Sequence, residues 1–290
     1  MNQARLRRWA AWGAKNGPDW FVKVAPVLIG IAAFLVAHRA RSCVFVNQRR
    51  IHGRREICLE IWDALQTFIA FAHNLTESLY PERFSKGRRL ILRGRTTADE
   101  VMRDHGVIIA TAHVGPWDSA AMMFSQMSER PVLMLMAGEQ DDAAAQVQDY
   151  VRNGENIRVL RLGQSPLTAL YALEHLAQRK VVVAQMDRTF GRRAPTETQL
   201  FEQPFSMSPG LVRLAAISTC PILPVFTARL SATDHLVQVG EPIWVQARPS
   251  ASQIRAALEQ YLRQLESHLE QFPTQWFHFI REDKVQADQS

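Results

Sequence analysis

The chain has 290 residues, of which 47% are hydrophobic and 21% are charged, and its formal net charge is +6. This length and composition fit one large globular domain or two small ones, and they exclude collagen, coiled-coil, low-complexity and generally disordered chains. The three cysteines lie far apart without a Cys-x-x-Cys pair, so the sequence supports neither a disulfide framework nor a structural zinc site. We expect a protein of a reducing compartment with a substantial core and no metal.

Positive charge is concentrated at the N-terminus. Residues 1–60 contain 11 Lys and Arg against 3 Asp and Glu, whereas the rest of the chain contains 23 against 25. Residues 20–37 are apolar apart from Lys23, and arginines flank this run on both sides. Because a full span needs about 20 apolar residues, the run predicts either a short membrane span or an interfacial helix or hairpin, with a buried helix of a soluble protein as the third possibility. We expect residues 1–55 to form a membrane-associated helical segment.

The next elements alternate between helix and strand. Apolar residues recur at helical spacing over residues 56–79, up to the Tyr80-Pro81 break. The strands expected after this helix are 90–92, 107–112, 132–136, 157–160, 181–185 and 222–228. The helices expected between and after them are about 97–104, 117–128, 140–152, 166–178, 208–218 and 250–270. Short, continuously apolar strands such as VIIATA and VVVAQ need cover on both faces, so residues 56–290 are predicted to be an α/β domain whose mostly parallel sheet is flanked by helices.

The strand at 107–112 leads directly into the sequence His113-Val-Gly115-Pro-Trp117-Asp118. Ligands of parallel α/β sheets bind just beyond the carboxyl ends of the strands. Gly115 permits a tight turn, and the five-residue step from His113 to Asp118 can fold the carboxylate back onto the imidazole. In that geometry Asp118 would fix the ring tautomer and make His113 a base. In the alternative interpretation, Asp118 only caps its helix and His113 is an ordinary loop histidine.

Two further segments are candidate binding elements. The strand at 181–185 is followed by Asp187, Arg188, Arg192 and Arg193, and arginine forks suit phosphate and carboxylate ligands. Residues 208–210 (Ser208-Pro-Gly210) open a helix whose N-terminal amides can hold an anion. A solvated loop and a plain helix start are the respective alternatives.

In order and combination these motifs resemble the lauroyl and myristoyl acyltransferases of lipid A biosynthesis, within the wider lysophospholipid acyltransferase superfamily. The resemblance comprises the HxxxxD box at residues 113–118, the strand ending in Asp187, the box at 201–210, the strand TCPILPVF and the ending at 272–279, which looks like the family's Pro-x-Gln-Trp pattern.

The resemblance implies an acyltransferase with a glycerolipid-acyltransferase-like fold at the cytoplasmic face of a bacterial inner membrane. The donor would be a fatty acyl thioester of acyl carrier protein or coenzyme A, used as a co-substrate without any cofactor. The acceptor would be a hydroxyl of a membrane lipid or glycolipid. His113 and Asp118 would be catalytic, and substrate would bind at Gly115, Trp117, Asp187, Arg188, Arg192, Arg193, Ser208 and Gly210.

The sequence departs from the lipid A pattern at two places. The usual Gly-Asn-Trp-Glu is Gly-Pro-Trp-Asp here, and the arginine and asparagine usual after the next strand are missing from residues 134–139. A lipid or headgroup of a polyene pathway is therefore an alternative acceptor. A non-enzymatic membrane lipid-binding protein is the alternative from another class, and nucleic-acid binding is not expected because the basic residues flank an apolar run.

Overall fold

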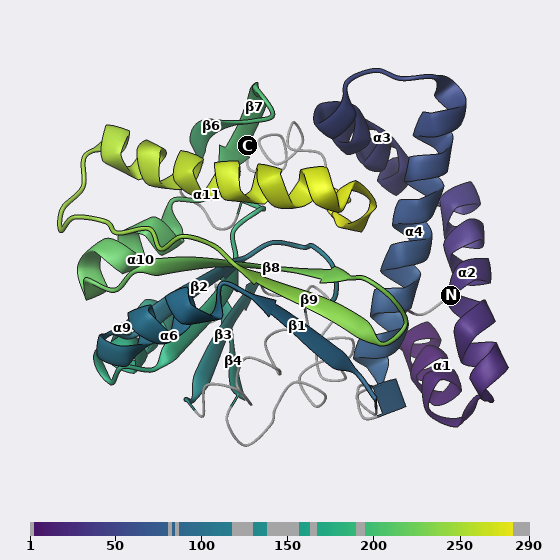
Figure 1. Ribbon diagram of the computed structural model, residues 1–290, viewed down its shortest axis with the longest axis horizontal. Coiled ribbons are helices and arrows are strands. Elements are labelled where there is room, and N and C mark those ends of the chain that lie inside the picture. Colours follow the sequence, from purple (N-terminus) through teal and green to yellow (C-terminus); the bar gives the residue numbers. More distant parts are fainter. Residues whose placement is uncertain are drawn as a thin grey trace.

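The computed structural model describes residues 3–80, 83–84, 87–117, 130–137, 157–162, 167–189 and 195–280 (Figure 1). The helices are α1 (Gln3–Asn16), α2 (Asp19–Val36), α3 (His38–His52), α4 (Ile57–Leu79), α6 (Arg95–Asp104), α9 (Thr168–Ala177), α10 (Gly210–Ser218), α11 (Ala251–Gln271) and the 3₁₀ turn η1 (Pro273–Gln275). The strands are β1 (Arg89–Arg93), β2 (Val107–Thr111), β3 (Val132–Ala137), β4 (Ile157–Leu162), β5 (Val181–Gln185), β6 (Thr196–Leu200), β7 (Gln203–Met207), β8 (Ile222–Arg229) and β9 (Asp234–Val239).

Within the described residues, seven strands form one sheet in the order β1-β9-β8-β2-β5-β3-β4. Every neighbouring pair is parallel except β8 and β9, which are antiparallel. β2 and β5 lie side by side at the centre, with Thr111 paired to Gln185 at their carboxyl ends. The prediction of a mostly parallel sheet is confirmed.

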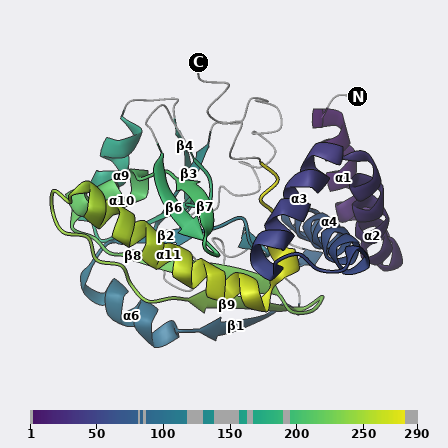
Figure 2. The ribbon, with the colours of Figure 1, turned by 90° about the horizontal axis from the view of Figure 1, so that it is seen from above.

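Helices cover both faces of this sheet, as Figures 1 and 2 show. Along β2, Ile108 and Ala110 face a core that contains residues of α9, α10 and α11, whereas Val107 and Ile109 face a core that contains residues of α6. All five residues of β2 are buried. This two-sided burial explains why the strand is apolar throughout rather than alternating.

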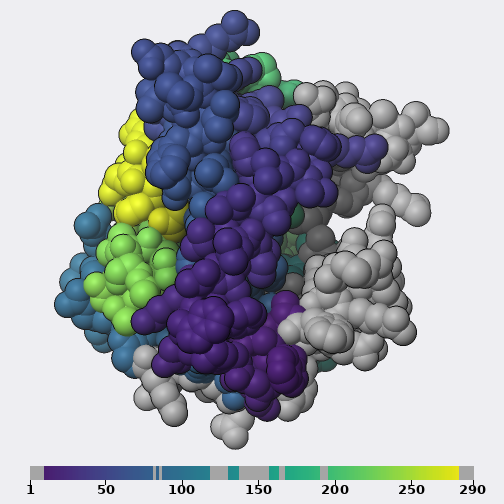
Figure 3. Space-filling view, turned by 90° about the vertical axis from the view of Figure 1, so that its right-hand side faces the viewer, coloured from purple at the N-terminus to yellow at the C-terminus, as the bar shows by residue number. Residues whose placement is uncertain are grey.

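Helices α1 to α4 form a helical layer beside the sheet, which Figure 3 views from its outer side. α2 packs along α4 through Val22, Pro26 and Gly30, which are spaced four residues apart. A Cβ atom on Gly30 would lie 2.7 Å from the Cα of Ile69 on α4, so the two backbones approach as closely as glycine allows. α4 also packs against α3 and η1. The domain boundary expected between residues 55 and 56 stays a prediction.

The predicted elements match the described ones except where local signals were weak. The predicted helices at 117–128 and 140–152 lie almost wholly outside the described residues. The β6–β7 hairpin was not predicted, because its turn is made by Phe201 and Glu202, which both have positive φ without a glycine or asparagine. The sequence predicted residues 1–55 to be helical without dividing them into α1, α2 and α3, and it did not predict β9.

Candidate active site

The exit of β2 is a tight loop, residues 112–117, which we call the active-site loop. Gly115 has φ +52°, and a Cβ there would lie 2.1 Å from the carbonyl oxygen of Thr227 on β8. Thr227 Oγ1 donates a hydrogen bond to the carbonyl of Val114 over 2.8 Å. The loop is therefore seated on β8, and only glycine fits at its closest point.

His113 lies in this loop, against Asp187 from the neighbouring strand exit. Because Thr111 of β2 and Gln185 of β5 are paired, the residues two positions after each of them lie close together beyond the carboxyl ends of these strands. His113 Nδ1 is 2.7 Å from Asp187 Oδ1, and the backbone N–H of His113 donates to Asp187 Oδ2 over 3.0 Å. An ionised carboxylate accepts only, so Nδ1 carries the proton and Nε2 is the basic nitrogen. Among the described residues, Nε2 has no hydrogen-bond partner.

The environment of this pair sets its protonation. Asp187 is fully buried. Burial alone would raise the pKa of Asp187, but the charge and hydrogen bond of His113, together with His278 and Arg188, outweigh it and hold the pKa below its usual range. Burial lowers the pKa of His113, with Asp187 opposing and Arg188 reinforcing that effect. At neutral pH the site therefore holds a carboxylate and a neutral imidazole.

The segment at residues 273–279, which we call the C-terminal segment, is hydrogen-bonded to Asp187 and to the backbone of the active-site loop. Trp276 Nε1 donates to Asp187 Oδ2 over 3.1 Å. The carbonyl of Gln275 accepts from Gly115 N over 2.9 Å, and Phe277 N donates to the carbonyl of His113 over 2.7 Å. The aromatic ring of Trp117 meets the His113 ring edge-to-face at 5.8 Å. Sequence reasoning noted this segment as a family ending but gave it no part in the site.

The structure brings five of the predicted site residues into one place; of the other five, three lie outside the described residues and two show no bond to the central pair. His113, Gly115, Trp117, Asp187 and Arg188 gather at the carboxyl ends of β2 and β5. Asp118, Arg192 and Arg193 lie outside the described residues. Ser208 Oγ is 3.4 Å from Gly210 N, and no hydrogen bond or ion pair within the described chain joins either residue to His113 or Asp187.

The carboxylate bonded to His113 was expected to be that of Asp118. In the described structure the carboxylate hydrogen-bonded to His113 Nδ1 is that of Asp187, which the sequence analysis placed among the substrate-binding residues. His113 and Asp187 follow two different strands, β2 and β5, that are neighbours in the sheet. Their contact cannot be predicted from the spacing in the sequence, because the sequence does not give the order of strands in the sheet. The role of Asp118 stays a prediction.

Arg188 is a partly buried cation next to this pair. One terminal nitrogen donates to the carbonyl of Phe277 over 3.0 Å, and the Nε atom is buried and has no hydrogen-bond partner within the described chain. Burial lowers the pKa of Arg188, and Asp187 opposes that shift. Within the described residues no group of three or more His, Cys, Asp or Glu side chains is arranged to hold a metal ion.

Comparison with known proteins gives the family. Residues 89–284 match the family model described as bacterial lipid A biosynthesis acyltransferase. A search of curated proteins finds no match. Among solved structures, the 1-acyl-sn-glycerophosphate acyltransferase PlsC of Thermotoga maritima is similar over 86% of this chain and 98% of its own, at 12% identity and a TM-score of 0.40. Because the family match covers well over half of the chain, this protein belongs to the bacterial lipid A biosynthesis acyltransferases and is an acyltransferase.

Proposed function

We propose that this acyltransferase moves a fatty acyl group from a thioester of acyl carrier protein or coenzyme A to a hydroxyl of a membrane lipid or glycolipid. The observation that carries the proposal is the buried hydrogen bond of 2.7 Å between His113 Nδ1 and Asp187 Oδ1. It fixes a neutral imidazole with its basic nitrogen, Nε2, unbonded among the described residues. The arrangement is that of a general base.

In the proposed reaction Nε2 of His113 removes the proton of the acceptor hydroxyl as its oxygen attacks the thioester carbonyl. The new C–O bond forms, the C–S bond breaks, and the leaving thiolate takes the proton back from Nε2. Asp187 holds the tautomer and stabilises the transient imidazolium. No covalent enzyme intermediate and no cofactor besides the thioester co-substrate are needed, and the base contributes about 10²- to 10⁴-fold of rate.

The other predicted site residues have proposed roles around this base. Arg188, partly buried beside Asp187, would stabilise the oxyanion of the thioester carbonyl. Arg192 and Arg193 would serve an acidic carrier protein or the phosphate of the donor. For Asp118, and for Ser208 and Gly210 at the start of α10, the expected contributions to catalysis and substrate binding remain proposals.

The family favours a lipid A-type glycolipid as the acceptor. The Gly-Pro-Trp-Asp sequence at residues 115–118 departs from the pattern of that family, so a polyene-pathway lipid is the second candidate.

We also propose that the helical layer holds the enzyme at a membrane, the cytoplasmic face of a bacterial inner membrane. α2 is long and apolar enough to cross a bilayer by length and composition. Its outward face exposes large apolar side chains, among them Trp20 (66% exposed), Leu28 (61%) and Leu35 (60%). An apolar face of this size, next to a basic N-terminus, suits anionic lipid headgroups and acyl chains.

The packing of α2 favours an interfacial position over a span. α2 contacts α4 through Val22, Pro26 and Gly30 along its length. α4 carries Glu60, which is ion-paired with Arg49 on α3, and Glu77, which is ion-paired with Arg88. A spanning α2 would either carry these charges into hydrocarbon, which is costly, or tear away from α4. We therefore propose that α2 lies in the membrane surface with its exposed face toward lipid.

The activity test incubates purified protein with radiolabelled acyl carrier protein or acyl coenzyme A and a membrane-lipid extract. Wild type should label a lipid, and a folded His113→Ala protein should not. Equal labelling by the two proteins would remove His113 from the mechanism.

The membrane test uses a double variant, Leu28→Asp with Leu35→Asp, which replaces two exposed leucines on α2. The matched control is Leu170→Asp with Ile217→Asp, which changes equally exposed apolar residues on α9 and α10. In sedimentation with anionic vesicles, the α2 variant should remain soluble and the control should pellet like wild type. Pelleting of both variants would locate the membrane contact elsewhere.

A further inference from the structure

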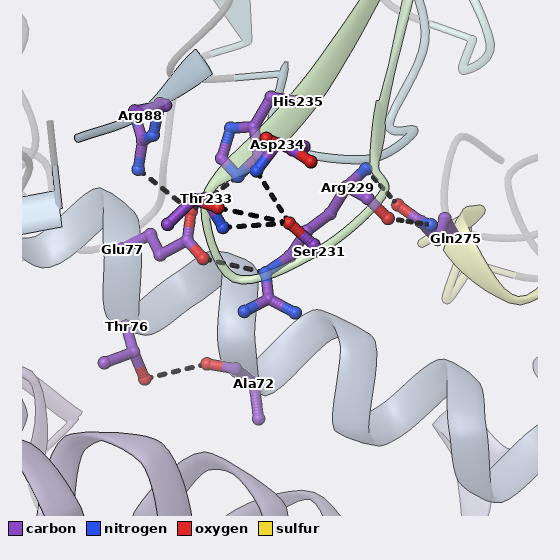
Figure 4. Close-up of polar contacts among 10 residues, drawn as sticks. All are labelled: Ala72, Thr76, Glu77, Arg88, Arg229, Ser231, Thr233, Asp234, His235 and Gln275. Carbon is purple, nitrogen blue, oxygen red and sulfur yellow. Dashed lines mark hydrogen bonds and ion pairs between the residues drawn. The ribbon is translucent and has the colours of Figure 1, made fainter. Parts of the chain in front are cut away.

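A second group of buried charges lies where the helical layer meets the sheet (Figure 4). Glu77 comes from α4, Arg88 precedes β1, Arg229 ends β8 and His235 belongs to β9; we call these four residues the Glu77 cluster. Glu77 Oε2 is 3.0 Å from a terminal nitrogen of Arg88, and Glu77 Oε1 is 2.9 Å from Nε of Arg229. His235 Nε2 lies 3.2 Å from Glu77 Oε2, without hydrogen-bond geometry.

The charges of the cluster do not balance. Two guanidinium groups share one carboxylate, and the side chains of Glu77 and Arg88 are only 4% and 6% exposed. Within the described chain neither arginine has a second carboxylate partner, and nearby Asp234 is paired with Arg89. Buried charges are normally compensated, and among the described residues the cluster carries one positive charge that has no counter-ion.

Several polar atoms around the cluster are also without hydrogen-bond partners in the described part of the chain. These buried atoms are Arg88 Nε, both side-chain polar atoms of Asn74 and Nδ1 of His235. Asn74 lies three residues before Glu77 and therefore on the same side of α4. The two terminal nitrogens of Arg229 have no partner among the described residues, and its side chain is 24% exposed. Since buried polar groups are nearly always satisfied, the unpaired donors, namely Arg88 Nε, Asn74 Nδ2 and the terminal nitrogens of Arg229, indicate a ligand with several acceptor atoms.

The cluster adjoins the active-site loop. The side chain of Gln275 binds the backbone of Arg229 at both its N–H (2.8 Å) and its carbonyl (2.9 Å). The carbonyl of the same Gln275 accepts from Gly115 N. A Cβ on Gly115 would lie 2.8 Å from the Cα of Ala228, the residue before Arg229. An anion held by Arg229 would therefore lie between the helical layer and the loop that carries His113.

We propose that Arg229, supported by Arg88, binds a phosphate group of the lipid acceptor and so holds its hydroxyl near His113. Arginine forks match phosphate oxygens in geometry and charge, and the partly exposed terminal nitrogens of Arg229 give the group a way in. The identification of the ligand as the acceptor rests on the proposed function, whereas binding of phosphate at Arg229 does not. The Glu77 carboxylate fixes the Nε side of the guanidinium so that its terminal nitrogens face the ligand.

The test measures binding without an acyl donor, so that its outcome is independent of catalysis. Purified full-length protein in nonionic detergent is titrated with inorganic phosphate, with lysophosphatidic acid, and with the monoacylglycerol of the same chain, which lacks the phosphate. Sodium chloride at matched ionic strength is the blank. The readout is the thermal unfolding midpoint, which should rise by about 5 °C at about 100 times Kd.

Three variants locate the response. Arg229→Gln should weaken binding of the phosphate probe at least about tenfold, because a buried charged partner is lost. Arg229→Lys keeps the positive charge but loses the fork, and it should bind with intermediate affinity if Arg229→Gln does not fold. Arg89→Gln, which changes an exposed arginine on the neighbouring strand, should bind like wild type.

Each outcome decides the proposal. Stabilisation by lysophosphatidic acid but not by monoacylglycerol, lost with Arg229, supports a lipid phosphate. Stabilisation by inorganic phosphate as well means that the phosphate group itself is sufficient, whereas stabilisation by inorganic phosphate alone overturns the lipid source. No response to either phosphate probe beyond that of chloride, or an equal response in the Arg229 variants, would mean that the cluster is only a structural ion pair.

Discussion

Asp187 and Glu77 are two buried carboxylates at the same end of the molecule, and they have different kinds of partner. Asp187 is bonded to a histidine and to two N–H groups, whereas Glu77 is bonded to two arginines. The pKa of Glu77 is also below its usual range, since His235, Arg229 and Arg88 together outweigh the effect of burial. Both groups are thus anions at neutral pH. Asp187 is hydrogen-bonded to its histidine, whereas Glu77 is hydrogen-bonded to arginines and has His235 Nε2 only at 3.2 Å. Burial alone therefore does not distinguish a catalytic carboxylate from one that holds fixed charge.

The largest effect should come from the partner of the base. Asp187→Asn keeps the shape of the side chain but removes the charge that stabilises the imidazolium, and we expect kcat to fall on the order of 10²- to 10⁴-fold. The measurement is single-turnover acyl transfer on samples with native circular dichroism. Asp118→Asn is measured beside it, because that residue was expected to have the same role. A loss confined to Asp118→Asn would assign the orienting role to Asp118 and give Asp187 a structural one.

The corresponding change in the Glu77 cluster should act on stability instead. Glu77→Gln leaves two guanidinium groups without a carboxylate in a mostly buried place, and we expect the free energy of unfolding to fall by about 3–5 kcal/mol. Urea unfolding gives this value. The matched control is Asp234→Asn, which breaks an exposed pair with Arg89 and should cost less than about 1 kcal/mol. An equal loss of unfolding free energy in Glu77→Gln and Asp234→Asn would contradict the expectation that the buried Glu77 ion pairs stabilise the fold more than the exposed Asp234–Arg89 pair.

The sequence predicts the strands of this fold better than its site. Continuous apolar runs reveal β2 and β5 because both faces of the sheet are covered, and the residue that follows each strand end is then known. Which strand ends are neighbours depends on the order of strands in the sheet, and no local pattern contains that order. For this reason His113 and Asp187 were each singled out, but their contact was not predicted.

The C-terminal segment illustrates a second limit. Trp276 lies 89 residues from Asp187 along the chain, and its N–H reaches the carboxylate only because β8 and α11 bring the segment back to the active-site loop. The sequence marked this segment as resembling the family's Pro-x-Gln-Trp ending but did not indicate that it contacts the site. The same holds for the Glu77 cluster, whose four members come from α4, the residue before β1, β8 and β9.

Histidines without a carboxylate partner extend the comparison to pH. Burial lowers the pKa of His268 and of His278 to about 4, with partial opposition from the carbonyl of Thr227 and from Asp187 respectively. The unfolded chain binds protons at these positions near pH 6.5, whereas the folded protein does not until about pH 4. Stability is therefore complete above about pH 6.5 and falls as the pH drops toward 4, by about 2–3 kcal/mol for each histidine.

Urea unfolding at pH 7.5, 5.5 and 4.5 checks this dependence. His268→Gln keeps a donor for the carbonyl of Thr227 and removes one titrating group, so it should flatten the curve over this range. A wild-type curve that is flat between pH 6.5 and 4.5 would contradict the expected contribution of the buried histidines.

The smallest effect should come from the N–H group that Trp276 donates to Asp187. Trp276→Phe keeps most of the buried ring and removes only this donor, so we expect kcat to fall by at most about tenfold, in line with the loss of one hydrogen bond to a charged group. The informative readout is the pH–rate profile. A carboxylate that no longer shares its charge with the indole attracts the His113 proton more strongly, which raises the pKa of His113 and moves the acid limb of the profile to higher pH. A loss of activity at every pH without movement of that limb would mean that Trp276 only fills space, and that the acidity of the His113–Asp187 pair is set by burial and by Arg188.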